Sequence, residues 1–320
     1  MKRIARIAFA VAAGGILAAT LVGTPVFLLR APVLVVTDPL FAAIYGEDRI
    51  RARQRSASRA LFRRVIPVSI ADDAGPDILI AAVAVAAAEP FAVMFPARFS
   101  TAAERFHAEF PDVRVVLFRG AAPASGFPEG GGNLSVFGTD RETDIFRAGL
   151  LAGIIGRAVR EREPAAAEDG EEAAPAAVRE THVLIEDRFA DQTERALFLG
   201  AATGMDPGSA VVFADSAEGM PDAAGVATLV LAGSGGDLLE RNMGIPTILF
   251  GWIHPDLTSG DVLAVFDDSP WAKVVPAARL AGSGETSALL RSDPLIFSAR
   301  ISDNGVSRML RRAAVRVPRE

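Results

Sequence analysis

The stretch NLSVFGTDRETDIFRAGLLAGIIGRAVR, residues 133–160, combines the two patterns that decide the fold. Its first residues, 133–137, form a short apolar run typical of a buried strand. The following residues form a longer, charge-bearing segment with the length of a helix. Gly149, Gly153 and Gly156 recur at spacings of four and three, so they line one face of that helix. We therefore predict a strand followed by a helix that starts near Arg141.

Two other interpretations of the glycine-bearing segment fail on its charges and spacing. Arg147 and Arg157 interrupt the apolar run, which leaves too few uncharged residues for the roughly 20 that a bilayer-spanning helix needs. Neither a Gly-Lys-Ser/Thr ending nor a GxGxxG spacing occurs there, so a phosphate-binding loop is excluded. We predict instead a lobe-joining helix whose small residues allow close packing beneath the second half of the chain.

Short apolar runs alternate with helical patterns along the rest of the chain, which predicts βαβ units. In the first half we expect strands at 32–37, 64–70, 77–82, 113–118 and 133–137, and helices at 48–64 and 100–110. In the second half we expect strands at 182–187, 209–216, 227–236, 245–252 and 261–268. The fold class is therefore α/β, with two Rossmann-like lobes whose parallel sheets are joined by a hinge.

The alternation also predicts the domain boundaries. Residues 31–140 form the first lobe, completed by roughly residues 253–290, and residues 141–252 form the second, completed by roughly residues 291–320. Between the halves, residues 161–180 contain acidic residues, alanines and two prolines, with no large apolar side chain before Val178. Because such a segment cannot bury enough apolar surface to offset its ordering entropy, we predict an exposed, mobile acidic loop.

Residues 1–30 have the charge pattern of an export segment. MKRIAR supplies a basic start, and residues 7–29 are uncharged and apolar up to Arg30. This pattern fits either a cleaved signal peptide or an N-terminal membrane anchor. Basic residues on the cytoplasmic side place the rest of the chain outside the cytoplasm. We expect a periplasmic or extracytoplasmic location, with the first segment in the inner membrane if it is uncleaved.

Composition excludes several classes of function. The net charge of −6 argues against nucleic acid or an anionic membrane surface as the main partner, because phosphate binding needs clustered Lys and Arg. The chain has no cysteine, so disulfides, thiol catalysis and thiolate metal sites are impossible. Its three histidines form no HExxH pattern, and no GxSxG motif occurs. We therefore expect a protein that is not an enzyme, with no catalytic residue, no metal and no cofactor.

Three segments follow one another in a characteristic order and spacing. They are FPDVRVVLFRG (110–120), the stretch quoted first (133–160) and HVLIEDRFADQTERALFLGAATG (182–204). LVLAGSGGDLLERNMGIPTILFGWIHPD (229–256) adds a glycine-bearing strand, turn and helix, followed by a further strand. Together they resemble the basic membrane protein family of exported bacterial substrate-binding proteins. The resemblance covers residues 33–310 and implies the type I periplasmic-binding fold with a small ligand, often a nucleoside.

The chain departs from that family where the ligand would bind. After the first strand, VVTDPLFAAIYGEDR keeps Asp38 and an aromatic residue, Phe41, but lacks the family's asparagine. GWIHPD stands in place of an acidic pair, and AVFDDSP has Asp267 and Asp268 where the family has a lysine. The resemblance therefore leaves open whether the ligand is a nucleoside, another small molecule, or absent.

Several polar and aromatic residues follow predicted strands, at the edge of an α/β sheet where ligands bind. The candidate ligand-binding residues are Asp38, Phe41, Gly235, Asp237, Trp252 and His254. An aromatic ring there can stack on a flat ligand, a carboxylate can bind hydroxyls, and exposed backbone amides can bind a ligand oxygen.

Each of these residues also has a purely structural explanation. Asp38 can cap a helix that begins at Pro39, and Asp237 can cap a tight GSGGD turn. Trp252 can fill the core near the hinge, and His254, beside Pro255, can lie in a surface turn.

Two functions remain in view. The first is an exported solute-binding protein that captures a small ligand between its lobes for an ABC-type permease or a sensor. The second is a ligand-free scaffold or sensor module of the cell envelope with the same fold. An open pocket lined by Asp38 and Trp252 favours the first, and a pocket plugged by Phe41 favours the second.

Overall fold

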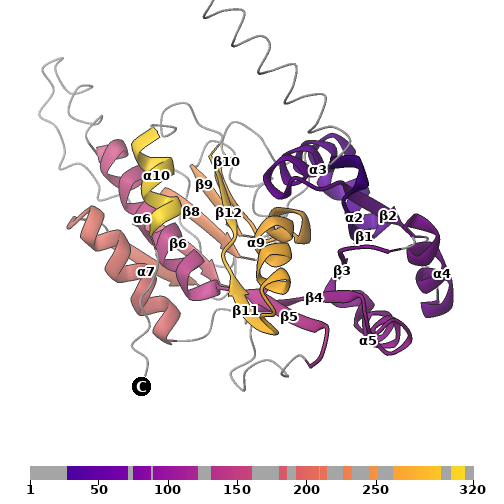
Figure 1. The fold of residues 1–320 in the computed structure, drawn as a ribbon. Helices are drawn as coiled ribbons and strands as arrows, with labels where there is room; N and C mark the ends of the chain where they lie inside the picture. The colour runs from indigo at the N-terminus through magenta and orange to yellow at the C-terminus, as the bar shows by residue number, and fades with distance from the viewer. Residues whose placement is uncertain are drawn as a thin grey trace, which may run out of the picture.

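Two six-stranded sheets form the frame of the molecule (Figure 1). The computed structural model describes residues 27–70, 75–87, 89–121, 131–160, 180–185, 192–208, 210–214, 226–232, 246–250, 262–296 and 304–313. The N-terminal residues 1–26 and nearly all of the acidic segment, residues 161–179, lie outside these ranges. No helix within the described ranges is long and apolar enough to cross a bilayer.

The first sheet has the strand order β11-β5-β4-β3-β1-β2, and every neighbouring pair is parallel. Its strands are β1 (Val33–Thr37), β2 (Val65–Ser69), β3 (Ala92–Phe95), β4 (Arg114–Ala121), β5 (Leu134–Thr139) and β11 (Ser287–Leu290). All five side chains of β1 are buried, as expected of a parallel strand covered on both faces. Val33 and Val35 belong to one core cluster and Leu34 and Val36 to another, so alternate residues face opposite layers.

The second sheet has the order β12-β10-β9-β8-β6-β7 and is parallel except for β12, which is antiparallel to β10. Its strands are β6 (Glu180–Ile185), β7 (Ala210–Ala214), β8 (Val226–Ala232), β9 (Thr247–Phe250), β10 (Val262–Asp267) and β12 (Asp293–Ile296). The chain passes from the first sheet to the second after β5, returns after β10, and crosses again between β11 and β12. These crossings join the two sheets through three segments.

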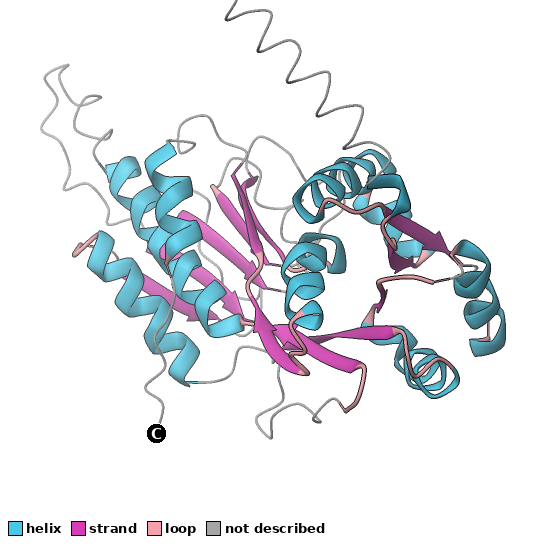
Figure 2. Cartoon of the chain, viewed as in Figure 1, coloured by secondary structure: helices cyan, strands magenta, loops and turns pink. Residues whose placement is uncertain are grey.

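Helices pack against the faces of both sheets (Figure 2). They are α2 (Pro39–Tyr45), α3 (Glu47–Leu61), α4 (Pro76–Ala86), the 3₁₀ helix η1 (Ala97–Phe99), α5 (Ser100–Glu109), α6 (Arg141–Arg160), α7 (Gln192–Met205), α9 (Pro270–Gly282) and α10 (Asn304–Arg312). Residues of α3 and α9 share one core cluster with β1, and residues of α4 and α5 share the cluster on its other face. The expected α/β class with mostly parallel sheets is confirmed.

The glycine face of α6 packs against α7, as its spacing predicts. A Cβ atom added to Gly149 would lie 2.5 Å from the Phe198 carbonyl oxygen and 2.9 Å from Ala201 Cβ. One added to Gly153 would lie 2.5 Å from the Ala202 carbonyl oxygen. Such distances are too short for real Cβ contacts, so glycine is what permits this approach. The prediction of a closely packed helix from Arg141 is confirmed.

Three of the sequence-based expectations differ from the structure. Residues 77–82, expected as a strand, belong to α4, where Pro76 occupies the first turn and an alanine-rich continuation favours a helix. The actual strand, β3, was missed because only four residues, 92–95, form it. Residues 262–267, expected to complete the first lobe, pair with β9 and β12 in the second sheet. An apolar strand pattern shows burial but does not show which sheet the strand joins.

Candidate functional site

The strand order of the first sheet creates a site at the carboxyl ends of β1 and β3. From β1 the chain continues to β2 on one side of it and then to β3 on the other side. The segments that leave β1 and β3 therefore diverge to opposite faces of the sheet and open a crevice between them, where ligands bind in α/β folds. Asp38 follows β1 directly, and Pro96 to Arg98 follow β3.

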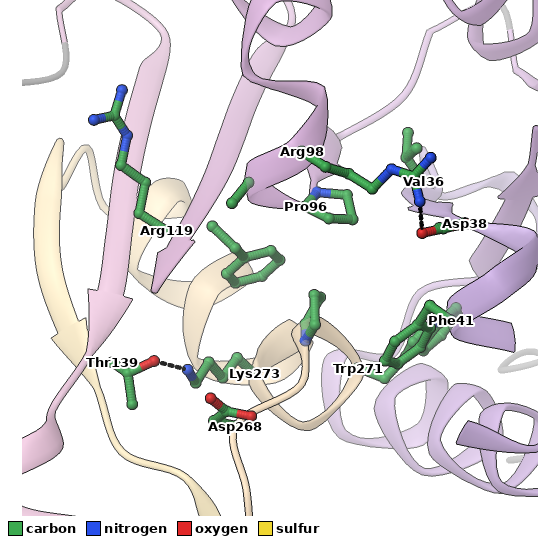
Figure 3. Close-up of a pocket in the computed structure, with 13 residues that line it drawn as sticks. Val36, Asp38, Phe41, Pro96, Arg98, Arg119, Thr139, Asp268, Trp271 and Lys273 are labelled. Carbon is green, nitrogen blue, oxygen red and sulfur yellow. Dashed lines mark hydrogen bonds and ion pairs between the residues drawn. The ribbon is translucent and has the colours of Figure 1, made fainter. Parts of the chain in front are cut away.

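A pocket of about 250 Å³ occupies this crevice (Figure 3). It is lined by Val36, Asp38, Phe41, Pro96, Ala97, Arg98, Phe118, Arg119, Thr139, Asp268, Pro270, Trp271 and Lys273. Most of these lie on strands of the first sheet or in the segments that leave them, while Asp268 directly follows β10 of the second sheet. The size and the mixture of apolar walls with a few polar groups suit a small organic ligand.

Asp38 makes two interactions at the N-terminus of α2. Its Oδ1 accepts a hydrogen bond from the Leu40 amide at 2.9 Å, so it caps the helix, as its structural explanation predicted. Its Oδ2 accepts from the Arg98 guanidinium, which arrives from η1 after β3 (Figure 3). The carboxylate is only 8% exposed and the arginine side chain is 40% exposed. This pair joins the two strand ends on which the site is built.

The first turn of α9 brings an indole to the pocket. Ser269 caps this helix, its hydroxyl accepting from the Ala272 amide at 3.2 Å, and Pro270 occupies the first position. Trp271 follows with only 2% of its surface exposed. Its Nε1 is buried and has no hydrogen-bond partner among the described residues. Phe41 packs against the same cluster, stacked on Tyr45 with ring centroids 4.9 Å apart.

Lys273 is a buried cation in the same pocket. It is 3% exposed, and its Nζ donates to Thr139 Oγ1 at 2.5 Å, which is its only hydrogen bond within the described part of the chain. Burial lowers the pKa of Lys273, while the nearby carboxylates of Asp268, Asp144 and Asp267 act in the opposite direction. Its remaining ammonium N–H groups have no acceptor among the residues that the structure describes.

Behind the pocket, a polar network connects α2 and α3 to the second sheet. Tyr45 Oη donates to Asp267 Oδ2 at 2.6 Å, and Arg53 donates to the same oxygen at 2.8 Å. Arg53 also reaches Asp293 Oδ2 at 2.6 Å. Burial, followed by the charge of Asp267, raises the pKa of Tyr45 to about 12. The phenol therefore stays protonated and acts as the donor to Asp267.

Only part of the predicted site lies in the structure's described ranges. Asp38 and Phe41 line the pocket, and Phe41 forms part of its wall. Gly235, Asp237, Trp252 and His254 lie outside the described residues, so their part in the site stays a prediction.

Sequence reasoning missed Arg98, Thr139, Trp271 and Lys273. Arg98 was missed together with β3. One signal could have found Lys273: apart from Lys2 it is the chain's single lysine, against 31 arginines.

Among the residues described, no three or more His, Asp or Glu side chains are grouped so that they could hold a metal ion. The ionisable groups of the pocket are instead Asp38 with Arg98, Asp268, Arg119 and Lys273. This arrangement offers hydrogen-bond donors and acceptors on an aromatic wall.

No protein-family model matches the sequence, and no curated protein matches it either. Solved structures do share its fold. A transcriptional activator of the comK gene from Bacillus halodurans is 15% identical, with a TM-score of 0.53 over 88% of this chain and 95% of that one. An ABC transporter system solute-binding protein from Conexibacter woesei is 11% identical, with a TM-score of 0.53 over 88% of this chain and 94% of that one. The chain thus has the type I periplasmic-binding fold.

Proposed function

We propose that this protein is an exported solute-binding protein, related to the basic membrane protein family, that captures a small ligand between two lobes for an ABC-type permease or a sensor. The pocket at the carboxyl ends of β1 and β3 carries this proposal, because it joins the Asp38–Arg98 pair to a buried indole and a buried ammonium. Export rests on the basic start and apolar run of residues 1–29.

The unpaired donors of the pocket indicate what the ligand must offer. Trp271 Nε1 is buried without an acceptor among the described residues, and Lys273 has one hydrogen bond there. Leaving such donors unpaired costs about 1–3 kcal/mol each, so a ligand with acceptor oxygens or nitrogens gains by pairing them. Phe41 and Trp271 supply apolar surface for a flat ring. A nucleoside combines a flat base with hydroxyls and is our leading candidate.

Two of the three segments that join the sheets contribute to the pocket. Thr139 ends β5, where the chain leaves the first sheet, and Asp268 follows β10, where it returns. A ligand held by these residues contacts the hinge itself. We propose that it binds one relative arrangement of the lobes better than the others, and so shifts the population toward the arrangement that a partner recognises.

Thermal unfolding of the purified chain with nucleosides, nucleobases and small sugars tests this function. A ligand that binds only the folded state raises the unfolding midpoint, by an amount that grows with the ratio of ligand concentration to Kd. We expect a rise with one class of compound and its loss in Asp38→Ala. Asp77→Ala is the matched control, because Asp77 forms a 2.6 Å pair with Arg105 away from the pocket and is 82% exposed. Its ligand response should equal that of the parent.

One observation favours the second function, a ligand-free scaffold. Both carboxylate oxygens of Asp38 are already engaged, one by the Leu40 amide and the other by Arg98. A ligand must therefore share these oxygens or displace Arg98. If no compound in the panel raises the midpoint, the Asp38–Arg98 pair is structural and the scaffold becomes the better account.

A further inference from the structure

A second surface lies at the opposite edge of the first sheet, where its strands begin. We define the amino-edge patch as Leu28, Leu29, Arg30, Phe62, Arg63 and Arg114. The first three precede β1, Phe62 and Arg63 precede β2, and Arg114 is the first residue of β4. Because these strands are parallel, their amino ends meet at one edge and their carboxyl ends, with the pocket, at the other.

The apolar part of the patch is unusually exposed. Leu28 is 53% exposed, Leu29 86% and Phe62 44%. Phe62 ends α3 in the left-handed region, with φ of 50°, and its ring contacts the Phe27 ring edge-on at 5.8 Å. Neighbouring large apolar groups that face solvent together mark an interaction surface more often than isolated ones do.

The three arginines of the patch have no acidic partner among the residues that the structure describes. Arg30 lies over the Phe62 ring at 5.1 Å, while Arg63 and Arg114 lie over Phe91 at 4.0 Å and 5.0 Å. Within the described part of the chain, none of the three arginines forms an ion pair. Burial, with Arg30 and Arg114 as like-charged neighbours, lowers the pKa of Arg63. The cluster therefore carries concentrated positive charge that an external anion would stabilise.

Nearby carboxylates do not neutralise the patch. Glu89, two residues before Phe91, and Asp112, two residues before Arg114, are both exposed, and neither forms an ion pair among the described residues. The chain's overall charge of −6 makes this local excess of arginine all the more distinct. Exposed apolar side chains on the same sheet edge as three arginines fit a surface that is apolar inside and anionic outside, which describes an anionic bilayer.

We propose that the amino-edge patch docks on an anionic phospholipid membrane. The sequence leading into the patch supports a membrane over other anionic partners, because residues 7–29 are continuously uncharged and end directly at Arg30. A segment of that length and composition matches a bilayer's apolar thickness. The docked protein holds its pocket at the sheet edge that faces away from the bilayer. This inference concerns membrane contact and does not depend on the identity of the ligand.

Because the chain lacks cysteine, one introduced cysteine reports on one position. Phe62→Cys in the full chain, labelled with an environment-sensitive fluorophore, is mixed with vesicles of phosphatidylcholine alone or with added phosphatidylglycerol. Ile78→Cys is the control, since Ile78 is 61% exposed in the first turn of α4, toward the opposite edge. We expect a blue shift at position 62 only with phosphatidylglycerol, its loss at high salt, and no shift at position 78.

Three other results would overturn the proposal. No shift at position 62 with anionic vesicles removes membrane docking. An equal shift with phosphatidylcholine alone removes the role of the arginines. A shift with inorganic phosphate or a soluble polyanion, without vesicles, makes the patch a site for soluble anions. Arg30→Glu in the labelled chain should abolish the shift and Arg30→Lys should keep it, provided that both variants retain the parent's unfolding midpoint.

Discussion

The Arg53 guanidinium donates to Asp267 Oδ2 at 2.8 Å and thereby ties α3, on the first sheet, to β10 of the second sheet. Asp267 is 1% exposed and Arg53 21%, so little water is present to replace the interaction. The same guanidinium reaches Asp293, which pairs with Asp267 across β10 and β12. One side chain of the first lobe thus holds two neighbouring strands of the second.

Arg53→Met should lower the free energy of unfolding by about 3 kcal/mol, because it leaves Asp267 buried without its cation. Arg51→Met on the same helix is the control. Arg51 is 61% exposed and pairs only with Glu47 and Asp48, so its loss should cost less than about 1 kcal/mol. Urea unfolding of both variants measures the difference. Equal losses would show that the Arg53 pair is screened by solvent like a surface pair.

Gly149→Ala should destabilise the protein by about 1–3 kcal/mol, because the new methyl group would meet the Phe198 carbonyl at 2.5 Å and force α6 away from α7. Gly200→Ala on α7 is the matched control, since nothing lies within 4 Å of an added Cβ there. Alanine favours a helix over glycine by about 1 kcal/mol, so this variant should be stabilised. Thermal unfolding distinguishes the two signs, and a stabilised Gly149→Ala would refute the tight α6–α7 contact.

The sequence predicts α6 correctly and misses β3, and the length of each element explains both results. The α6 helix is 20 residues long, so its periodic pattern is visible in the sequence. Its glycines recur at helical spacing, and the sequence excludes a membrane span or a phosphate loop as their explanation. By contrast, β3 has four residues and cannot show a period. Because β3 was not predicted, Arg98 was not predicted as a site residue either. A residue is recognised as lying at the carboxyl end of a strand only if the strand itself is found.

Asp38 was identifiable because it follows a strand, Val33–Thr37, whose apolar run is unambiguous. Trp271 and Lys273 were not identified, since they lie on a helix and reach the pocket only through the return of the chain from β10 to the first sheet. That return depends on which sheet β10 joins, and long-range pairing of this kind is not encoded in local pattern. The sequence therefore predicted the site residues that follow β1 and missed those that lie where the chain crosses between the two sheets.

Asp144 should make stability fall as pH rises from about 4 to about 6. Burial raises the pKa of Asp144 from its ordinary value of 3.8 to about 6, although Ser292 and Arg147 act in the opposite direction. A carboxyl with a raised folded-state pKa binds its proton more tightly when folded, so its contribution is full below the unfolded pKa and is lost above the folded one.

The ionisation of other carboxylates also changes stability with pH, so the effect of Asp144 is measured as the difference between two proteins. The unfolding free energy of the parent minus that of Asp144→Asn should decrease between pH 4 and pH 6, because the variant has no proton to release at this position. Asp140→Asn is a control, since Asp140 also lies at the start of α6 but is 23% exposed. A difference that does not change with pH would show that Arg147 keeps Asp144 ionised in the fold.

Lys273→Met should abolish ligand-induced stabilisation while leaving the fold nearly as stable. Methionine keeps an unbranched chain, and Lys273, unlike Arg53, forms no ion pair within the described part of the chain, so the main loss is its hydrogen bond to Thr139 and we expect a change below about 2 kcal/mol. The ligand loses the ammonium that donates to Thr139 at 2.5 Å in the pocket. Arg279→Met, exposed on the same helix, should retain the full ligand response in thermal unfolding. A Lys273→Met chain that still responds to ligand would place the ligand away from α9, and one that fails to fold would make Lys273 part of the hinge rather than of the ligand site.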